Sequence, residues 1–101
     1  MKATEILHQK MILKHESGNR LAVFEFVVWQ IPRSKDYPNG VKFCAFLSEN
    51  GVALWGFDNH QPKGPHLHVR EQELGYVFRG IEELKEDIIA MIQKEGFIYE
   101  G

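Results

Sequence analysis

The sequence has little cysteine and lacks long hydrophobic runs and internal repeats. Cys44 is the single cysteine among 101 residues, so an internal disulfide is excluded and a buried thiol is expected. No apolar run approaches the roughly 20 residues that a membrane-spanning helix needs. The first residues, Met1 to Glu5, also lack the apolar stretch of a secretory signal. These absences predict one soluble domain over residues 1–101, located in a reducing cytoplasm and not in a membrane.

The sequence also lacks an excess of basic residues. Its formal net charge is −2, which argues against bulk electrostatic capture of nucleic acid. The charge is uneven, however. Residues 1–70 contain nine Lys or Arg and six Asp or Glu, whereas residues 71–101 contain three and eight. This asymmetry is compatible with a weakly basic working face and an acidic C-terminal helix, although the acidic residues would equally suit an ordinary solvated helix.

Chemically versatile side chains are concentrated in residues 56–68, which read GFDNHQPKGPHLH and include three of the five histidines. The prolines and glycines in this stretch are typical of a loop with a fixed conformation. After the loop, His66, His68 and Arg70 alternate with Leu67 and Val69. Side chains on a strand alternate between its faces, so the two histidines and the arginine are predicted to share one face. Leu67 and Val69 would then face the core.

The pattern of apolar and turn residues predicts an α+β fold. Residues 20–31 are apolar on both alternating faces, which predicts a central strand covered on both sides. Pro32 ends this strand and opens a surface loop, and Asn50-Gly51 marks a hairpin. The expected elements are a short helix at 3–8, strands at 10–15, 20–31, 41–48, 52–58, 66–70 and 76–79, and a helix at 81–94. The predicted architecture is an antiparallel meander of about five strands, with the C-terminal helix packed on one face.

The residues of the loop suit metal-independent cleavage of RNA. RNA supplies its own nucleophile, the 2′-hydroxyl, so cleavage requires a base, an acid and cations for the phosphate. We predict catalytic roles for His66, His68, Lys63 and Asp58. Asp58 has an alternative, because an aspartate after a strand commonly starts a turn by accepting local backbone hydrogen bonds. The residues predicted to bind substrate are Asn59, His60, Arg70, Arg79 and Lys42.

Two other readings of the same residues stay open. A His-x-His pair on a strand is a familiar spacing for metal ligands, and Asp58, His60 or His8 could add further ligands. No cysteine pair and no His-Glu-x-x-His motif supports such a site, so we expect no metal, while a divalent ion at His66 and His68 remains an alternative. In the second reading the loop is not catalytic and binds RNA or a protein partner.

These motifs resemble the TumE family of small bacterial toxin–antitoxin proteins. In that family a Val- and Trp-rich strand ends in proline, and Arg-Tyr-Asp-Asn, Lys-Gly, His-x-His and Tyr-x-Phe motifs follow. The matching segments here are Val27-Val28-Trp29-Gln30-Ile31-Pro32, Gly40-Val41-Lys42-Phe43, Gly56-Phe57-Asp58-Asn59, Lys63-Gly64-Pro65-His66-Leu67-His68 and Tyr76-Val77-Phe78. The resemblance extends over nearly the whole chain. Gly56 and Phe57 depart from it, because members often have arginine and tyrosine there.

The resemblance implies a toxin that acts on RNA and is encoded beside a helix-turn-helix antitoxin. If the usual arginine of the family binds phosphate, Gly56 makes this chain a weakened or divergent member. A homodimer is a further possibility that the sequence leaves open.

Overall fold

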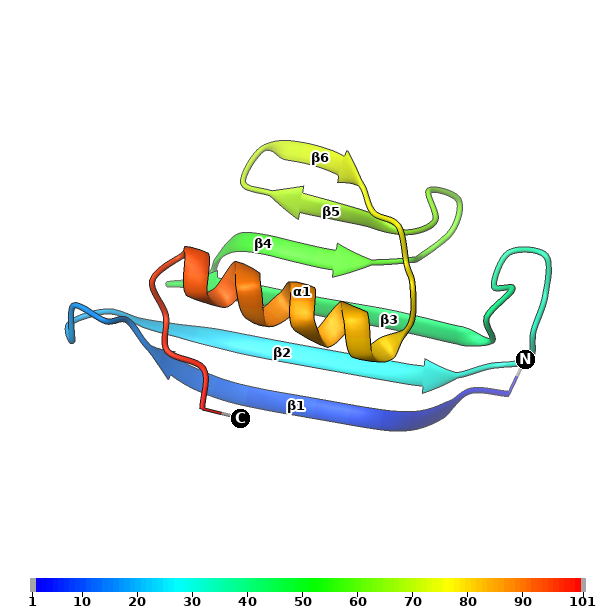
Figure 1. Ribbon diagram of the computed structural model, residues 1–101, viewed down its shortest axis with the longest axis horizontal. Helices are drawn as coiled ribbons and strands as arrows, with labels where there is room; N and C mark the ends of the chain where they lie inside the picture. Colours follow the sequence, from blue (N-terminus) through cyan, green and yellow to red (C-terminus); the bar gives the residue numbers. More distant parts are fainter. Residues whose placement is uncertain (1, 101) are drawn as a thin grey trace.

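The computed structural model, which describes residues 2–100, consists of one antiparallel sheet and one helix (Figure 1). The strands follow one another across the sheet in chain order, each paired with the next. The elements are β1 (Thr4–Lys14), β2 (Leu21–Gln30), β3 (Val41–Glu49), β4 (Val52–Asp58), β5 (His66–Val69), β6 (Gln72–Gly75) and α1 (Ile81–Lys94). The α+β class and the meander are therefore confirmed, with six strands in place of about five.

Two segments differ from the sequence prediction. Residues 3–8 were expected as a short helix, but residues 4–8 belong to β1, which pairs with β2 from Thr4 to Lys14. The last strand is Gln72–Gly75, whereas residues 76–79 run as an extended connection to α1. Pairing with β2 makes residues 4–8 part of a strand, and pairing with β5 makes Gln72–Gly75 the last strand. Local sequence preference does not decide the structure of either segment.

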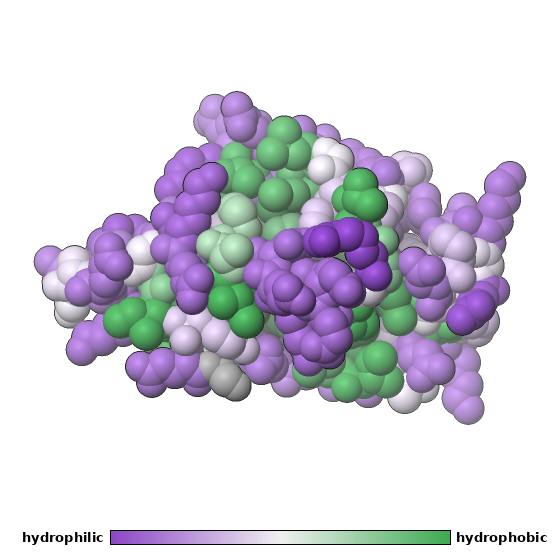
Figure 2. Space-filling model, viewed as in Figure 1, coloured by the Kyte–Doolittle hydropathy of each residue, from purple (hydrophilic) through white to green (hydrophobic). Residues whose placement is uncertain are grey.

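Helix α1 lies across one face of the sheet, and its bounds agree with the prediction (Figure 1). Its apolar stripe buries Leu84, Ile88 and Ile92 against the sheet. Glu82 and Glu83 stand in the first turn, where acidic side chains suit the helix dipole. Figure 2 shows hydrophilic residues over the outer side of the helix and hydrophobic surface on both sides of it. No helix within residues 2–100 is long and apolar enough to cross a membrane.

The core lies between α1 and the sheet. Alternate residues of the central strands point toward the helix and are almost fully buried, including Phe24, Phe26, Phe43, Leu47 and Trp55. Leu67 on β5 points the same way and packs, partly buried, against this core. Leu67 therefore faces the core as predicted, but its side chain is only partly buried.

The opposite face of the sheet is covered by no other element of residues 2–100. The expectation that both faces of β2 are covered is therefore wrong: Val23, Val27 and Trp29 are only half-buried. The strand register places side chains on this open face in rows that run across the strands. One row consists of Val27, Cys44, Asp58 and His66. The next consists of Glu25, Phe46, Gly56, His68 and Glu73.

Candidate functional site

The loop between β4 and β5 is tied to the rest of the fold by hydrogen bonds. Asn59 is buried, and its side chain accepts a hydrogen bond from the Phe43 amide at 2.9 Å and donates one to the Val41 carbonyl at 3.0 Å. The Gln61 side chain donates to the Asp36 carbonyl at 2.9 Å, which joins this loop to residues 32–40. Asn59 thus fixes the loop onto β3, and its amide is already used by backbone groups.

His66 and His68 lie side by side on the open face of β5. Their ring centroids are 4.9 Å apart, and the rings are nearly perpendicular. His66 is buried, whereas the side chain of His68 is 46% exposed. The prediction that both histidines project from one face is confirmed by the strand register and by this contact.

The tautomer of His66 follows from its contact with the loop. Its Nδ1 lies 2.8 Å from the Gly64 carbonyl oxygen, which can only accept a hydrogen bond. Nδ1 therefore carries the proton, and a neutral His66 has its lone pair on Nε2. This nitrogen lies 3.4 Å from Asp58 Oδ1, which also accepts the His60 amide at 3.1 Å. Asp58 thus starts the turn, which was the predicted alternative to a catalytic role. It also lies beside His66.

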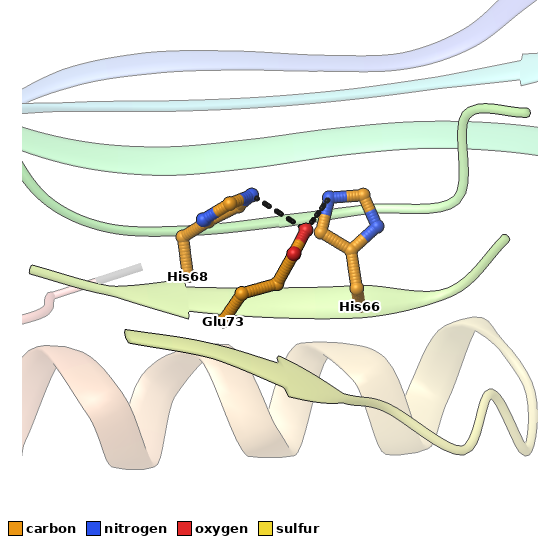
Figure 3. Close-up of side chains that lie close together, drawn as sticks. All are labelled: His66, His68 and Glu73. Carbon is orange, nitrogen blue, oxygen red and sulfur yellow. Dashed lines mark ion pairs between the residues drawn. The ribbon is translucent and has the colours of Figure 1, made fainter. Parts of the chain in front are cut away.

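Glu73 is the site residue that the sequence prediction missed. It stands opposite His68 in the β5–β6 hairpin, and its Oε1 lies 3.3 Å from His68 Nε2 and 3.9 Å from His66 Nε2 (Figure 3). The Lys63 ammonium donates to the same oxygen at 2.5 Å. This hydrogen bond lowers the pKa of the Glu73 carboxyl. Gln72–Gly75 is almost entirely polar, so the sequence pattern did not indicate a strand there.

The structure brings only some of the predicted residues together. Lys63, Asp58, His66 and His68 form one cluster with Glu73. Asp58 and Glu73 give this cluster two carboxylates against the single Lys63 ammonium. It is this group, hereafter the hairpin cluster, that offers acid–base chemistry or metal ligation.

The predicted arginines lie elsewhere. Arg70 was expected on the face of His66 and His68, but it leaves the strand with a positive φ of 54°. Its guanidinium pairs with Glu95 at 2.8 and 3.0 Å, next to the C-terminal end of α1. Arg79 pairs with Asp87 on α1 at 2.5 Å. The shared-face prediction is therefore wrong for Arg70, because the turn directs its side chain to the helix side.

Lys42 and His60 form a second polar location beside the hairpin cluster. Together with Ala3, Trp29 and Ile31 they line a pocket of about 190 Å³. Burial lowers the pKa of the His60 imidazole, and its Nε2 is enclosed without a hydrogen-bond partner. Both features favour a neutral His60.

Among the residues described, His66, His68 and Glu73 place one ligand atom each within 4.8 Å of one another. The metal reading of the sequence offered Asp58, His60 or His8 as further ligands, and the structure adds Glu73 to these. His8 is far from the cluster, at the β1 edge, where its Nε2 contacts Glu25 at 2.8 Å.

A comparison with protein families gives a match to the model described as Toxin TumE over residues 3–95. The chain belongs to the TumE toxin family. This confirms the resemblance that the motifs indicated and shows a toxin component. Membership of a toxin family implies an antitoxin partner in general. No curated protein and no solved structure gave a match.

The two departures of this TumE family member fall on opposite faces of β4. Phe57 is buried in the core, where it contacts Tyr76 with ring centroids 5.0 Å apart. Gly56 pairs with His68, so a side chain at this position would project onto the open face beside the hairpin cluster.

Proposed function

We propose that this TumE family toxin acts on RNA and cleaves it by metal-independent transesterification at the hairpin cluster. One observation carries the proposal: two histidines share a strand face, and one of them has its tautomer fixed beside a carboxylate. Histidine is the side chain whose ordinary pKa makes both protonation states available near neutral pH. A pair can therefore supply a base and an acid at the same time.

The roles follow from the contacts of each ring. Neutral His66 has its lone pair on Nε2, so it is the base that removes the proton from the 2′-hydroxyl. The 2′-oxygen attacks phosphorus, and the bond to the 5′-oxygen breaks. His68, which is more exposed, donates a proton to the leaving 5′-oxygen, so the products are a 2′,3′-cyclic phosphate and a 5′-hydroxyl.

Asp58 and Lys63 support these steps. At 3.4 Å from His66 Nε2, Asp58 stabilises the imidazolium that forms on the base. Lys63 is exposed and paired with Glu73, and its flexible side chain can exchange this carboxylate for the substrate phosphate. Lys42 and His60 adjoin the cluster and bind the flanking nucleotides in this proposal, whereas Arg70 and Arg79 are engaged with α1.

The direct test is RNA cleavage by purified His66→Ala and His68→Ala variants. Each is expected to lose about a hundred- to ten-thousand-fold in rate, the usual contribution of a single acid or base. His8→Ala is the matched control, because this exposed histidine lies at the other edge of the sheet. The wild-type protein should stay active in a chelator and yield the cyclic phosphate. Alanine variants that cleave at the wild-type rate would remove the histidines from the mechanism.

A second candidate is a non-enzymatic binding module. Its supporting observation is that the cluster lies on an open sheet face, with the side chains of His68 and Glu73 46% and 41% exposed. In this case pure protein would bind RNA or a protein partner without generating a cyclic phosphate. The product analysis above separates the two candidates.

We also propose that a helix-turn-helix antitoxin covers the hairpin cluster, and that toxin and target RNA meet in the cytoplasm. The exposed charges of the cluster are the surface that a neutralising partner would need to mask. Cleavage assays on the co-purified complex test this, because full activity in the complex would exclude occlusion. Light scattering on the free toxin tests the alternative of a homodimer.

A further inference from the structure

We propose that His66, His68 and Glu73 bind a divalent transition-metal ion, and that the bound ion switches off the toxin. The binding site is inferred from geometry alone. The inhibitory effect rests on the proposed function, because it assumes that the two imidazoles transfer protons during catalysis.

The three ligand atoms are close to the spacing of a metal site. Zinc ligands stand about 2.0–2.1 Å from the ion in a tetrahedron, which places neighbouring ligand atoms about 3.3 Å apart. The distance from His68 Nε2 to Glu73 Oε1 is already 3.3 Å, and that from His66 Nε2 is 3.9 Å. All three atoms lie within 4.8 Å of one another, and the three side chains point toward one another (Figure 3). The exposed side chains of His68 and Glu73 can close the remaining gap by rotation.

The buried ligand is already oriented for the ion. The Nδ1–H group of His66 donates to the Gly64 carbonyl at 2.8 Å, the contact that metal-binding histidines commonly make through their second nitrogen. This contact leaves the lone pair on Nε2, which lies 3.9 Å from Glu73 Oε1. Asp58, 3.4 Å from the same nitrogen, adds a second negative charge near the ion.

Lys63 competes with the ion for Glu73. Its ammonium donates to Oε1, the same oxygen that faces both histidines. The Lys63 side chain is 57% exposed, so it can turn into solvent when an ion arrives. Removal of this ammonium should therefore strengthen metal binding, although it weakens the proposed catalysis.

The donor set identifies the class of ion. Two imidazoles and one carboxylate suit Zn²⁺, Fe²⁺, Co²⁺ or Ni²⁺, whereas Mg²⁺ and Ca²⁺ prefer oxygen ligands alone. Coordination uses the Nε2 lone pair that the base requires to accept a proton. A metal-bound His66 therefore cannot act as the base, and the same holds for proton transfer by His68.

The binding test uses the metal-free full chain, with calorimetric titration of Zn²⁺ and visible absorption of Co²⁺. We expect one saturable site, at least about tenfold weaker in Glu73→Gln and in His68→Ala, because the loss of even an outer-shell partner of a ligand typically costs about 10- to 100-fold in affinity. His8→Ala should bind as the wild type does, and Lys63→Met should bind several-fold more tightly. Absence of saturable binding, or equal affinity of Glu73→Gln and His8→Ala, would overturn the site.

The activity test adds Zn²⁺ to the RNA cleavage reaction. Inhibition with a midpoint equal to the binding constant, and lost in Glu73→Gln, supports both the site and its inhibitory role. Cleavage that requires Zn²⁺ overturns the inhibitory role and the metal-independent mechanism while it supports the site. Intact cleavage in a chelator without any zinc binding overturns the site and leaves the proposed function in place.

Discussion

The two faces of the sheet are similar in hydrophobicity on β2 but differ in what covers them. Phe24, Phe26 and Val28 point toward α1 and are at most 1% exposed. Their neighbours Val27 and Trp29 point the other way and remain half-buried. A single helix can cover one face only, so apolar strand residues do not reveal which face becomes the core. The covered face supplies packing, and the open face presents the titratable side chains.

The strongest test of this contrast is a pair of matched core and open-face deletions. Phe26→Ala removes a ring that is 1% exposed and should lower the free energy of unfolding by about 3–5 kcal/mol. Phe46→Ala removes the same ring from a half-buried position on the open face of the adjacent strand and should cost much less. Urea unfolding followed by circular dichroism measures both. Equal losses would mean that the open face is packed as tightly as the core.

A smaller effect is expected from Gly56→Arg, which restores the arginine of the family pattern. Position 56 faces His68 across the strand pair, so the guanidinium would reach the proposed phosphate position. A Cβ there meets only Ala45 O at 3.5 Å and Phe46 Cβ at 3.7 Å, which are ordinary contacts. We expect about a tenfold lower KM for RNA, equivalent to about 1.4 kcal/mol. Gly56→Ala is the uncharged control, and if it changes KM as much as the arginine does, phosphate contact is not the cause.

The smallest predicted effect is a loss of stability at alkaline pH through Tyr76, which packs beside the covered face. Burial, together with its hydrogen bond to Asp87, raises the pKa of Tyr76 from 10.0 to about 12. Because the folded-state pKa is raised, the stabilisation is complete below pH 10.0 and is lost as the pH rises toward about 12. Melting temperatures across this interval should fall less in Tyr76→Phe than in the wild type. An equal fall in melting temperature for the two proteins would exclude a contribution from the ionisation of Tyr76.

The sequence predicted those elements whose patterns are strong and local. The apolar stripe of residues 81–94 marked α1 correctly, and the alternation at His66, Leu67 and His68 placed both histidines on one face. Residues 3–8 were misassigned because this edge segment has weak alternation, and its pairing with β2 decides its structure. Glu73 was missed for a related reason. Leu74 is the single large apolar residue in Gln72–Gly75, so only the pairing of this segment with β5 makes it a strand.

The position of Glu73 depends on the length of one tight turn. Arg70 and Glu71 connect β5 to β6, and Arg70 adopts a left-handed φ of 54° that closes the hairpin. Loss or gain of a single residue in this turn would move Glu73 to the opposite face, away from both histidines. The core would be unaffected, because every residue of β6 is exposed. A homologous chain with an insertion or deletion in this turn would thus keep the fold but lose the contact of Glu73 with the histidines. The length of this turn is therefore the feature by which homologous chains could be classified.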